Sequence, residues 1–195
     1  MNGDNQPEKP AIKPKKNAQR KKWFVIFTVV VLILVAGAVG GWVYVSYQKS
    51  QAADKLAAQQ SERNTVISQT GGQAQTIVNN GGKASQAGAV YEKAINSTTD
   101  STLKYNLLMD EATMYFNAND FSQALTIALQ AESVDKDANV EQFIAQIYES
   151  MGDKTNAIKY YQSAILLVDT SQPMGSSDVQ YYQSKVESLG GTINK

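Results

Sequence analysis

The sequence predicts an all-α protein, in which one N-terminal transmembrane helix precedes a short α-solenoid of helical hairpins and a C-terminal capping helix. Three observations carry this prediction. The first is an uncharged apolar run, Trp23–Val45, that follows a cluster of Lys and Arg. The second is helical spacing of apolar residues from about residue 83 onward, without strand-like alternation. The third is a pair of similar stretches offset by 33 residues.

The apolar run Trp23–Val45 is long enough to cross a membrane. As a helix it extends about 34 Å, and the hydrocarbon core of a bilayer is about 30 Å thick. Residues 1–22 carry seven Lys or Arg against two Asp or Glu. The positive-inside rule therefore predicts a cytoplasmic N-terminus and an extracytoplasmic C-terminal part. We expect a single-pass protein of the cell (inner) membrane with an uncleaved signal-anchor.

A cleaved signal peptide is the alternative interpretation of the same run. Ala36-Gly37-Ala38 has the small-residue pattern of a cleavage site, and Phe24–Val35 has the length of a signal-peptide hydrophobic region. The anchor is favoured because the apolar run continues through Trp42 and Val45. Cleavage would leave these side chains at the mature N-terminus.

The composition argues against several functional classes. The chain has no Cys and no His, which excludes disulfides, thiolate nucleophiles, Cys/His zinc sites and imidazole acid–base catalysis. We expect no enzyme activity, no cofactor and no metal. Beyond residue 22 the chain has a net charge of −5, which argues against nucleic-acid binding because that depends on Lys and Arg contacts to phosphates.

Composition also divides the chain into segments. Residues 1–22 contain three of the four prolines and show no apolar periodicity, which is typical of disorder. Residues 48–70 are rich in Ala, Gln and Ser, which favours a helical spacer, and Gly71-Gly72 and Gly81-Gly82 interrupt the pattern after it. The expected order is a cytoplasmic tail (1–22), the transmembrane helix (23–45), a stalk with a glycine-broken linker (46–82), the repeats (83–170), and a linker with a capping helix (171–195).

The two similar stretches have the pattern of paired helices. Ala112, Tyr115 and Ala124 recur 33 residues later as Ala145, Tyr148 and Ala157. This resembles the tetratricopeptide repeat (TPR), a helix–turn–helix of about 34 residues with small residues at the helix contact. The first copy departs from the family, with Glu111 where leucine is usual and Ala128 where an aromatic residue is usual.

An upstream copy of the repeat is less complete. Gly82, Ala87, Tyr91 and Ala94 fall in register with the later copies. Its first helix would be the short segment Gln73–Asn80. Whether this first repeat (73–97) is fully formed is open at the level of sequence.

The resemblance implies a protein-binding groove. In TPR proteins the first helices of successive repeats line a concave surface that takes peptides. The positions that correspond by register carry mostly amides and hydroxyls, which can hydrogen-bond a peptide backbone. They are Asn106, Met109, Thr113, Phe116, Asn117, Asn139, Gln142 and Gln146. The alternative is that these polar side chains only keep the exposed helix surface hydrated and bind no ligand.

Two acidic patterns have simpler explanations than a chemical site. Asp135-x-Asp137-x-Asn139 begins like a calcium loop, but Val140 replaces the required glycine. We expect Asp and Asn there to cap a helix. The pair Asp110-Glu111 points in two directions on a helix, and we expect it to lie on a solvated face.

The expected function is a membrane-tethered scaffold that binds another protein on the extracytoplasmic side and assists an export or envelope-assembly complex. Its layout is similar to that of the ancillary TPR subunit of the bacterial protein translocon. The alternative is a structural stalk protein that binds no client and self-associates through its membrane helix. Gly37 and Gly41 form a small-xxx-small pair through which two copies could pack as a homodimer.

Overall fold

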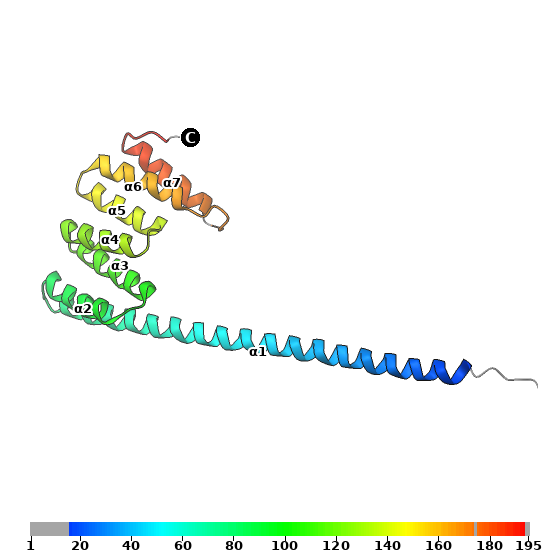
Figure 1. Ribbon diagram of the computed structural model, residues 1–195. Coiled ribbons are helices and arrows are strands. Elements are labelled where there is room, and N and C mark those ends of the chain that lie inside the picture. The colour runs from blue at the N-terminus through cyan, green and yellow to red at the C-terminus, as the bar shows by residue number, and fades with distance from the viewer. Residues whose placement is uncertain (1–15, 174, 194–195) are drawn as a thin grey trace, which may run out of the picture. The chain divides into compact units, whose positions relative to one another are not determined.

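The computed structural model describes residues 16–173 and 175–193. These residues form seven α-helices and, within the described ranges, no strand (Figure 1), which confirms the all-α fold class. The helices are α1 (Lys16–Asn79), α2 (Ala84–Ser97), α3 (Ser101–Asn117), α4 (Phe121–Val134), α5 (Ala138–Ser150), α6 (Lys154–Leu167) and α7 (Gly175–Ser188).

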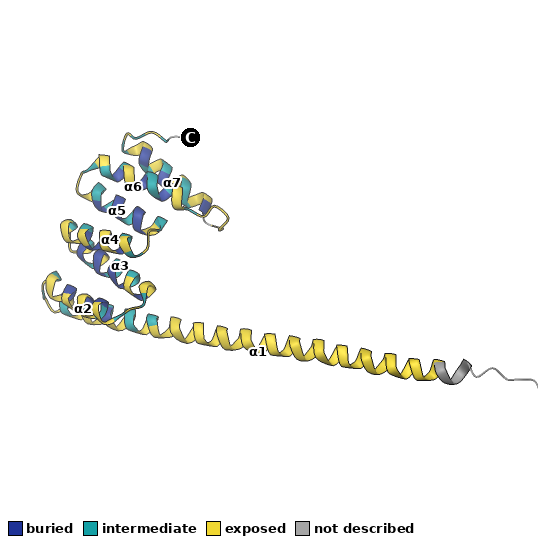
Figure 2. Cartoon of the chain, viewed as in Figure 1, coloured by how far each residue is buried: buried dark blue, intermediate teal, exposed yellow. Residues whose placement is uncertain are grey.

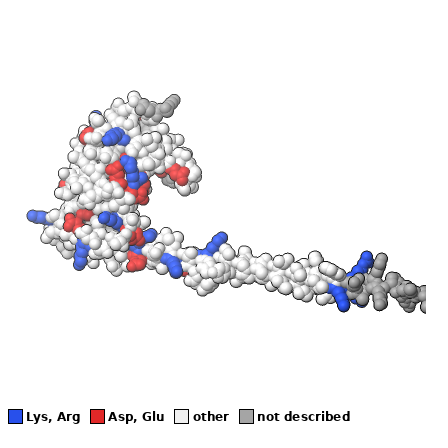
Figure 3. All heavy atoms as spheres, viewed as in Figure 1, with Lys and Arg blue, Asp and Glu red and all other residues white. Residues whose placement is uncertain are grey.

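The chain divides into two compact units, residues 1–58 and residues 59–195. In the first unit every described side chain from Arg20 onward is exposed (Figure 2). An uncharged stretch separates the basic residues around Lys21 from Lys49, and Figure 3 shows this stretch without charged atoms. An 18-residue window of α1 has a mean hydropathy of 2.7, so this helix contains a segment that is long and apolar enough to cross a membrane. A membrane span and a signal sequence both have this composition.

The predicted disordered tail overlaps the start of α1. Residues 1–15 lie outside the described residues, but α1 already begins at Lys16. Residues 16–22 are therefore helical, in contrast to the prediction for residues 1–22. No proline follows Pro14 before the apolar run, and Lys, Ala, Gln and Arg all favour helix.

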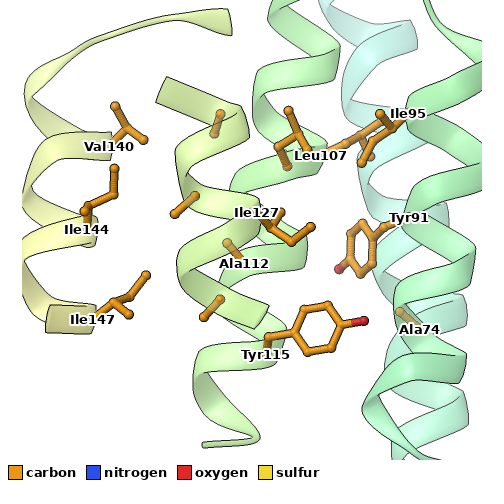
Figure 4. Close-up of a cluster of buried hydrophobic side chains, with 14 of the residues drawn as sticks. Ala74, Tyr91, Ile95, Leu107, Ala112, Tyr115, Ile127, Val140, Ile144 and Ile147 are labelled. Atoms are coloured by element: carbon orange, nitrogen blue, oxygen red, sulfur yellow. The ribbon is translucent and has the colours of Figure 1, made fainter. Parts of the chain in front are cut away.

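In the second unit, α3 pairs with α4 and α5 pairs with α6 as two antiparallel hairpins (Figure 1). Four small residues at the predicted helix contacts are completely buried: Ala112, Ala124, Ala145 and Ala157. Larger apolar side chains from neighbouring helices fill the space around them, as Figure 4 shows for Leu107, Ile127 and Ile144. The hairpin register predicted from the 33-residue offset is confirmed by this burial.

An upstream hairpin is formed by the C-terminal end of α1 together with α2. Ala74 of α1 and Tyr91 of α2 belong to the same core cluster as α3 and α4 (Figure 4). The helix passes through Gly71 and Gly72, where the sequence suggested a break, and ends before Gly81, which has φ +80°. A Cβ atom on Gly71 would lie 3.5 Å from the Tyr91 hydroxyl oxygen, and Ala74 and Ile77 just beyond it pack in the core, which outweighs the low helix propensity of glycine.

Aspartate side chains begin the helices of the two central hairpins. Asp100, Asp120, Asp137 and Asp153 each accept a hydrogen bond from the backbone N–H three residues later, at 2.9–3.2 Å. Asp137 belongs to the pattern that resembles a calcium loop, and it caps α5, as the sequence suggested. The Asp100 cap also pairs with Arg63 Nε at 2.7 Å, which ties α1 to the start of α3.

Helix α7 packs against α6 and closes the array. Tyr182 and Val186 of α7 are buried in a second core cluster with Ala145, Tyr161 and Ala164. Tyr182 follows Tyr148 by 34 residues, close to the 33 that separate Tyr148 from Tyr115. The predicted capping helix thus continues the tyrosine spacing of the first helices α3 and α5.

Candidate protein-binding groove

Two hollows lie along the first helices of the hairpins. The N-terminal hollow has a volume of about 440 Å³ and is formed by the end of α1, the start of α2, and α3. Its lining is mostly small or apolar, with one carboxylate and a few hydroxyl and amide groups. The lining residues are Gly71, Ala74, Gln75, Val78, Gly82, Ala84, Tyr91, Asp110, Thr113, Met114, Asn117 and Ala118.

The C-terminal hollow lies between α3, α5 and α7. It has a volume of about 550 Å³ and is lined by Phe116, Gln146, Glu149, Ser150 and Lys185. Lys185 Nζ pairs with the Glu149 carboxylate at 3.0 and 3.1 Å. The hydroxyl of Tyr161 donates to the same carboxylate at 2.9 Å. The charges of this hollow are therefore already paired with one another.

Four of the eight predicted groove residues line these hollows. Thr113 and Asn117 line the N-terminal hollow, and Phe116 and Gln146 line the C-terminal hollow. All four come from the first helices α3 and α5, the face that the TPR register indicated. Whether they contact a partner stays a prediction.

The other four predicted residues lie outside both hollows. Gln142 Oε1 accepts a hydrogen bond from the Tyr182 hydroxyl at 3.2 Å, so this side chain is already bonded to α7. Asn139 is exposed, and its amide donates to Asp137 at 3.2 Å. Asn106 is half-buried, and Met109 packs against the main core cluster.

Phe116 has a structural contact as well as a place in the hollow. Its ring centroid lies 5.4 Å from that of Phe121 and 5.6 Å from that of Phe143. Such tilted aromatic pairs stabilise the packing of α3 against α4 and α5. The half-buried Phe116 is therefore shared between the core and the hollow.

The pair Asp110-Glu111 corrects one expectation in part, because Glu111 is buried while Asp110 is half-buried. Glu111 is 1% exposed and its Oε2 atom has no hydrogen-bond partner. Burial, and secondarily the carboxylate of Glu92, raises the pKa of Glu111 to about 7. Asp110 is half-buried at the N-terminal hollow, and burial also raises its pKa. Helices α2 and α4 both pack against α3, and Glu111 lies on the part of α3 that they cover.

A second buried carboxylate, Glu141, lies in the first turn of α5. It is completely buried, and Lys136 Nζ lies 2.6 Å from its Oε1 atom. Lys136 also pairs with Glu132 at 2.7 Å, so it joins the end of α4 to the start of α5. The described residues contain no group of three Asp or Glu side chains arranged for a metal ion. Sequence patterns alone gave no sign of Glu141, because its burial depends on how neighbouring hairpins stack.

Comparison with known proteins agrees with the fold of the second unit. Residues 142–167, which span most of α5 and all of α6, match the tetratricopeptide repeat family. This hairpin is TPR-like, with the small residues of the family at its helix contact. No curated protein matches the chain.

Two solved structures show similarity at low identity. PcrH from Pseudomonas aeruginosa is 15% identical, with a TM-score of 0.49 over 63% of this chain and 90% of PcrH. The Hsp90 co-chaperone Cns1 from Saccharomyces cerevisiae is 12% identical, with a TM-score of 0.47 over 66% of this chain and 41% of the Cns1 chain.

Proposed function

We propose that this protein is a membrane-tethered scaffold whose TPR-like domain binds a protein or peptide partner. The segment Trp23–Val45 spans the cell membrane as an uncleaved anchor, with the N-terminus in the cytoplasm. The TPR-like domain faces the extracytoplasmic side, where it holds a partner for an export or envelope-assembly complex.

The observation that carries this proposal is the pair of hollows along the first helices. Volumes of about 440 and 550 Å³ each accommodate one or two side chains of a bound segment. The exposed polar side chains of Thr113 and Asn117 stand beside apolar contacts such as Met114. Concave sites that combine apolar contacts with a few polar groups are typical of ligand binding.

The tether is supported by the composition of α1. All described side chains of the apolar run are exposed, and Trp23 and Trp42 are each 72% exposed. No protein core covers these side chains, so a lipid environment would remove a large apolar surface from water. The basic residues before Trp23 favour the proposed orientation through the positive-inside rule.

Chemical crosslinking of the full chain in intact membranes, followed by identification of the crosslinked proteins, tests the proposal. We expect one predominant heterologous partner, crosslinked to residues of the TPR-like domain. Crosslinks between copies of this chain alone would contradict it. They would favour instead the stalk protein, because Gly37 and Gly41 have open space around them for a second helix.

A further inference from the structure

The N-terminal hollow differs from the C-terminal hollow in its charge. Asp110 is the only ionisable carboxylate among its lining residues, and no Lys or Arg is among them. In the C-terminal hollow, by contrast, Lys185 already neutralises Glu149. Of the two hollows, only the N-terminal one therefore presents a carboxylate that is not paired with a cation on its own wall.

Asp110 forms none of the ion pairs found among the described residues. Those pairs join Arg63 to Asp100, Lys136 to Glu132 and Glu141, and Lys185 to Glu149. Burial raises the pKa of Asp110, and no compensating cation lowers it. A half-buried carboxylate without a partner gains more from a ligand cation than a fully solvated one does, because water screens the pair less.

Polar groups accompany Asp110 in the N-terminal hollow. Tyr91 lines the same hollow as Asp110. The pKa of its hydroxyl is raised first by burial and then by the carboxylates of Asp110 and Glu111. Thr113 and Asn117, on the same helix as Asp110, contribute oxygen atoms that can accept hydrogen bonds. These groups favour a ligand that carries positive charge and several donors.

The wall of the hollow fits the stem of a long side chain. Val78 and Met114 supply apolar contacts, and Gly71 and Gly82 add no side chain to the wall. Lys and Arg place an aliphatic stem against such surfaces and keep the charged end at a polar group. A volume of about 440 Å³ is ample for one such side chain together with water.

We propose that the N-terminal hollow takes a Lys or Arg side chain of the bound partner, with its stem along Val78 and Met114 and its cation on the Asp110 carboxylate. This inference rests on the proposed function and specifies the partner segment, which carries a basic residue. The C-terminal hollow takes the uncharged part of the same segment.

Fluorescence anisotropy on the full chain in dodecyl maltoside micelles tests this assignment. The probe is a capped, fluorescein-labelled nonapeptide of alternating Ser and Ala with one central Arg, compared with the same peptide carrying norleucine at that position. We expect the Arg peptide to bind about tenfold more tightly than the norleucine peptide, the usual effect of a hydrogen bond to a charged group. Asp110→Asn should remove this preference.

Glu187→Gln is the matched control, because it removes one negative charge from an exposed position of α7. It should leave the affinity for the Arg peptide unchanged. Equal binding of the Arg and norleucine peptides to the unaltered protein would overturn the inference. Equal losses of affinity for the Arg peptide in Asp110→Asn and Glu187→Gln would overturn it too, and so would the absence of any binding of the Arg peptide. The peptide comparison needs no variant, so a folding defect of Asp110→Asn would not obscure it.

The two proposals fail in different ways. If crosslinking captures a heterologous partner but the anisotropy shows no preference for Arg, the scaffold function stands. The assignment of a basic partner side chain to the N-terminal hollow is then wrong. If crosslinking yields only self-association, the scaffold function itself is wrong.

Discussion

At the scale of single residues, Glu111 shows how one departure from a repeat pattern changes the chemistry of a core. Leucine is usual at this position in TPR proteins, and the position is buried here too. Gly88 of α2 faces it closely, because a Cβ atom on Gly88 would overlap the Tyr115 hydroxyl and lie 3.2 Å from Glu111 Oε1. A buried carboxylate in such a place favours its protonated form.

The raised pKa of Glu111 predicts a pH-dependent stability. Its pKa is about 7 in the folded state against 4.5 ordinarily, so the folded state binds the proton more tightly. The contribution of Glu111 is therefore fully present below pH 4.5 and is lost as the pH rises through 7, by about 3 kcal/mol in total. Glu111→Gln should remove this loss and raise the melting temperature at pH 8 relative to the unaltered protein.

Thermal melts of the full chain in detergent at pH 5 and pH 8 measure this effect. Glu187→Gln, which changes an exposed carboxylate, should keep the original pH dependence. An identical dependence in Glu111→Gln and the unaltered protein would show that Glu111 ionises normally in the folded state.

Some of these residues could be predicted from the sequence, and some could not. Ala145 and Ala157 follow from the repeat spacing, because small residues at fixed offsets mark helix contacts. The burial of Glu111 and Glu141 does not, since a carboxylate in sequence looks the same on a solvated face and between hairpins. Gln142 likewise reads as a free amide until α7 is placed over it.

At the scale of helices, the fit of α5 against α6 depends on small residues. Ala145 and Ala157 are completely buried, with Tyr161 and Ala164 also fully covered. Close-packed cores have no room for added methylene groups. Ala157→Leu should therefore overpack this contact and lower the free energy of unfolding by about 1–3 kcal/mol.

Lys159, also on α6, is the matched control because its side chain is exposed. Lys159→Ala should change the free energy of unfolding by less than about 0.5 kcal/mol. Chemical denaturation of the two variants measures both values. Equal stability of the two variants would show that the register assigned to α5 and α6 is wrong.

The boundaries of helices were less predictable than their existence. Two adjacent glycines usually interrupt a helix, yet α1 passes through Gly71 and Gly72 because Ala74 and Ile77 beyond them pack against the core. These tertiary contacts outweigh the destabilisation of a helix by glycine, which is about 1 kcal/mol per residue relative to alanine. The capping helix α7 was predicted from the sequence, but its hydrogen bonds to Gln142 and Glu149 of α5 were not.

At the scale of the whole molecule, the two units differ in how their apolar side chains are covered. The first unit exposes a continuous apolar surface, and the second buries its own core.

Protease added outside sealed cells should digest residues 48–195 and spare the N-terminal tail, because seven basic residues precede the apolar run. Immunoblotting with tags at each end measures this. Protection of the TPR-like domain would contradict the orientation.

The central claim is that the first-helix face of the TPR-like domain holds a protein partner, and site-specific photo-crosslinking in intact membranes tests it most directly. A benzoylphenylalanine side chain is introduced singly at Asn117 and Gln146, which line the two hollows, and at the exposed Gln130 and Lys159 of the second helices α4 and α6. We expect Asn117 and Gln146 to crosslink to one common partner, and we expect no crosslink to it from Gln130 or Lys159. Crosslinks to that partner from Gln130 and Lys159, with none from Asn117 and Gln146, would contradict the claim.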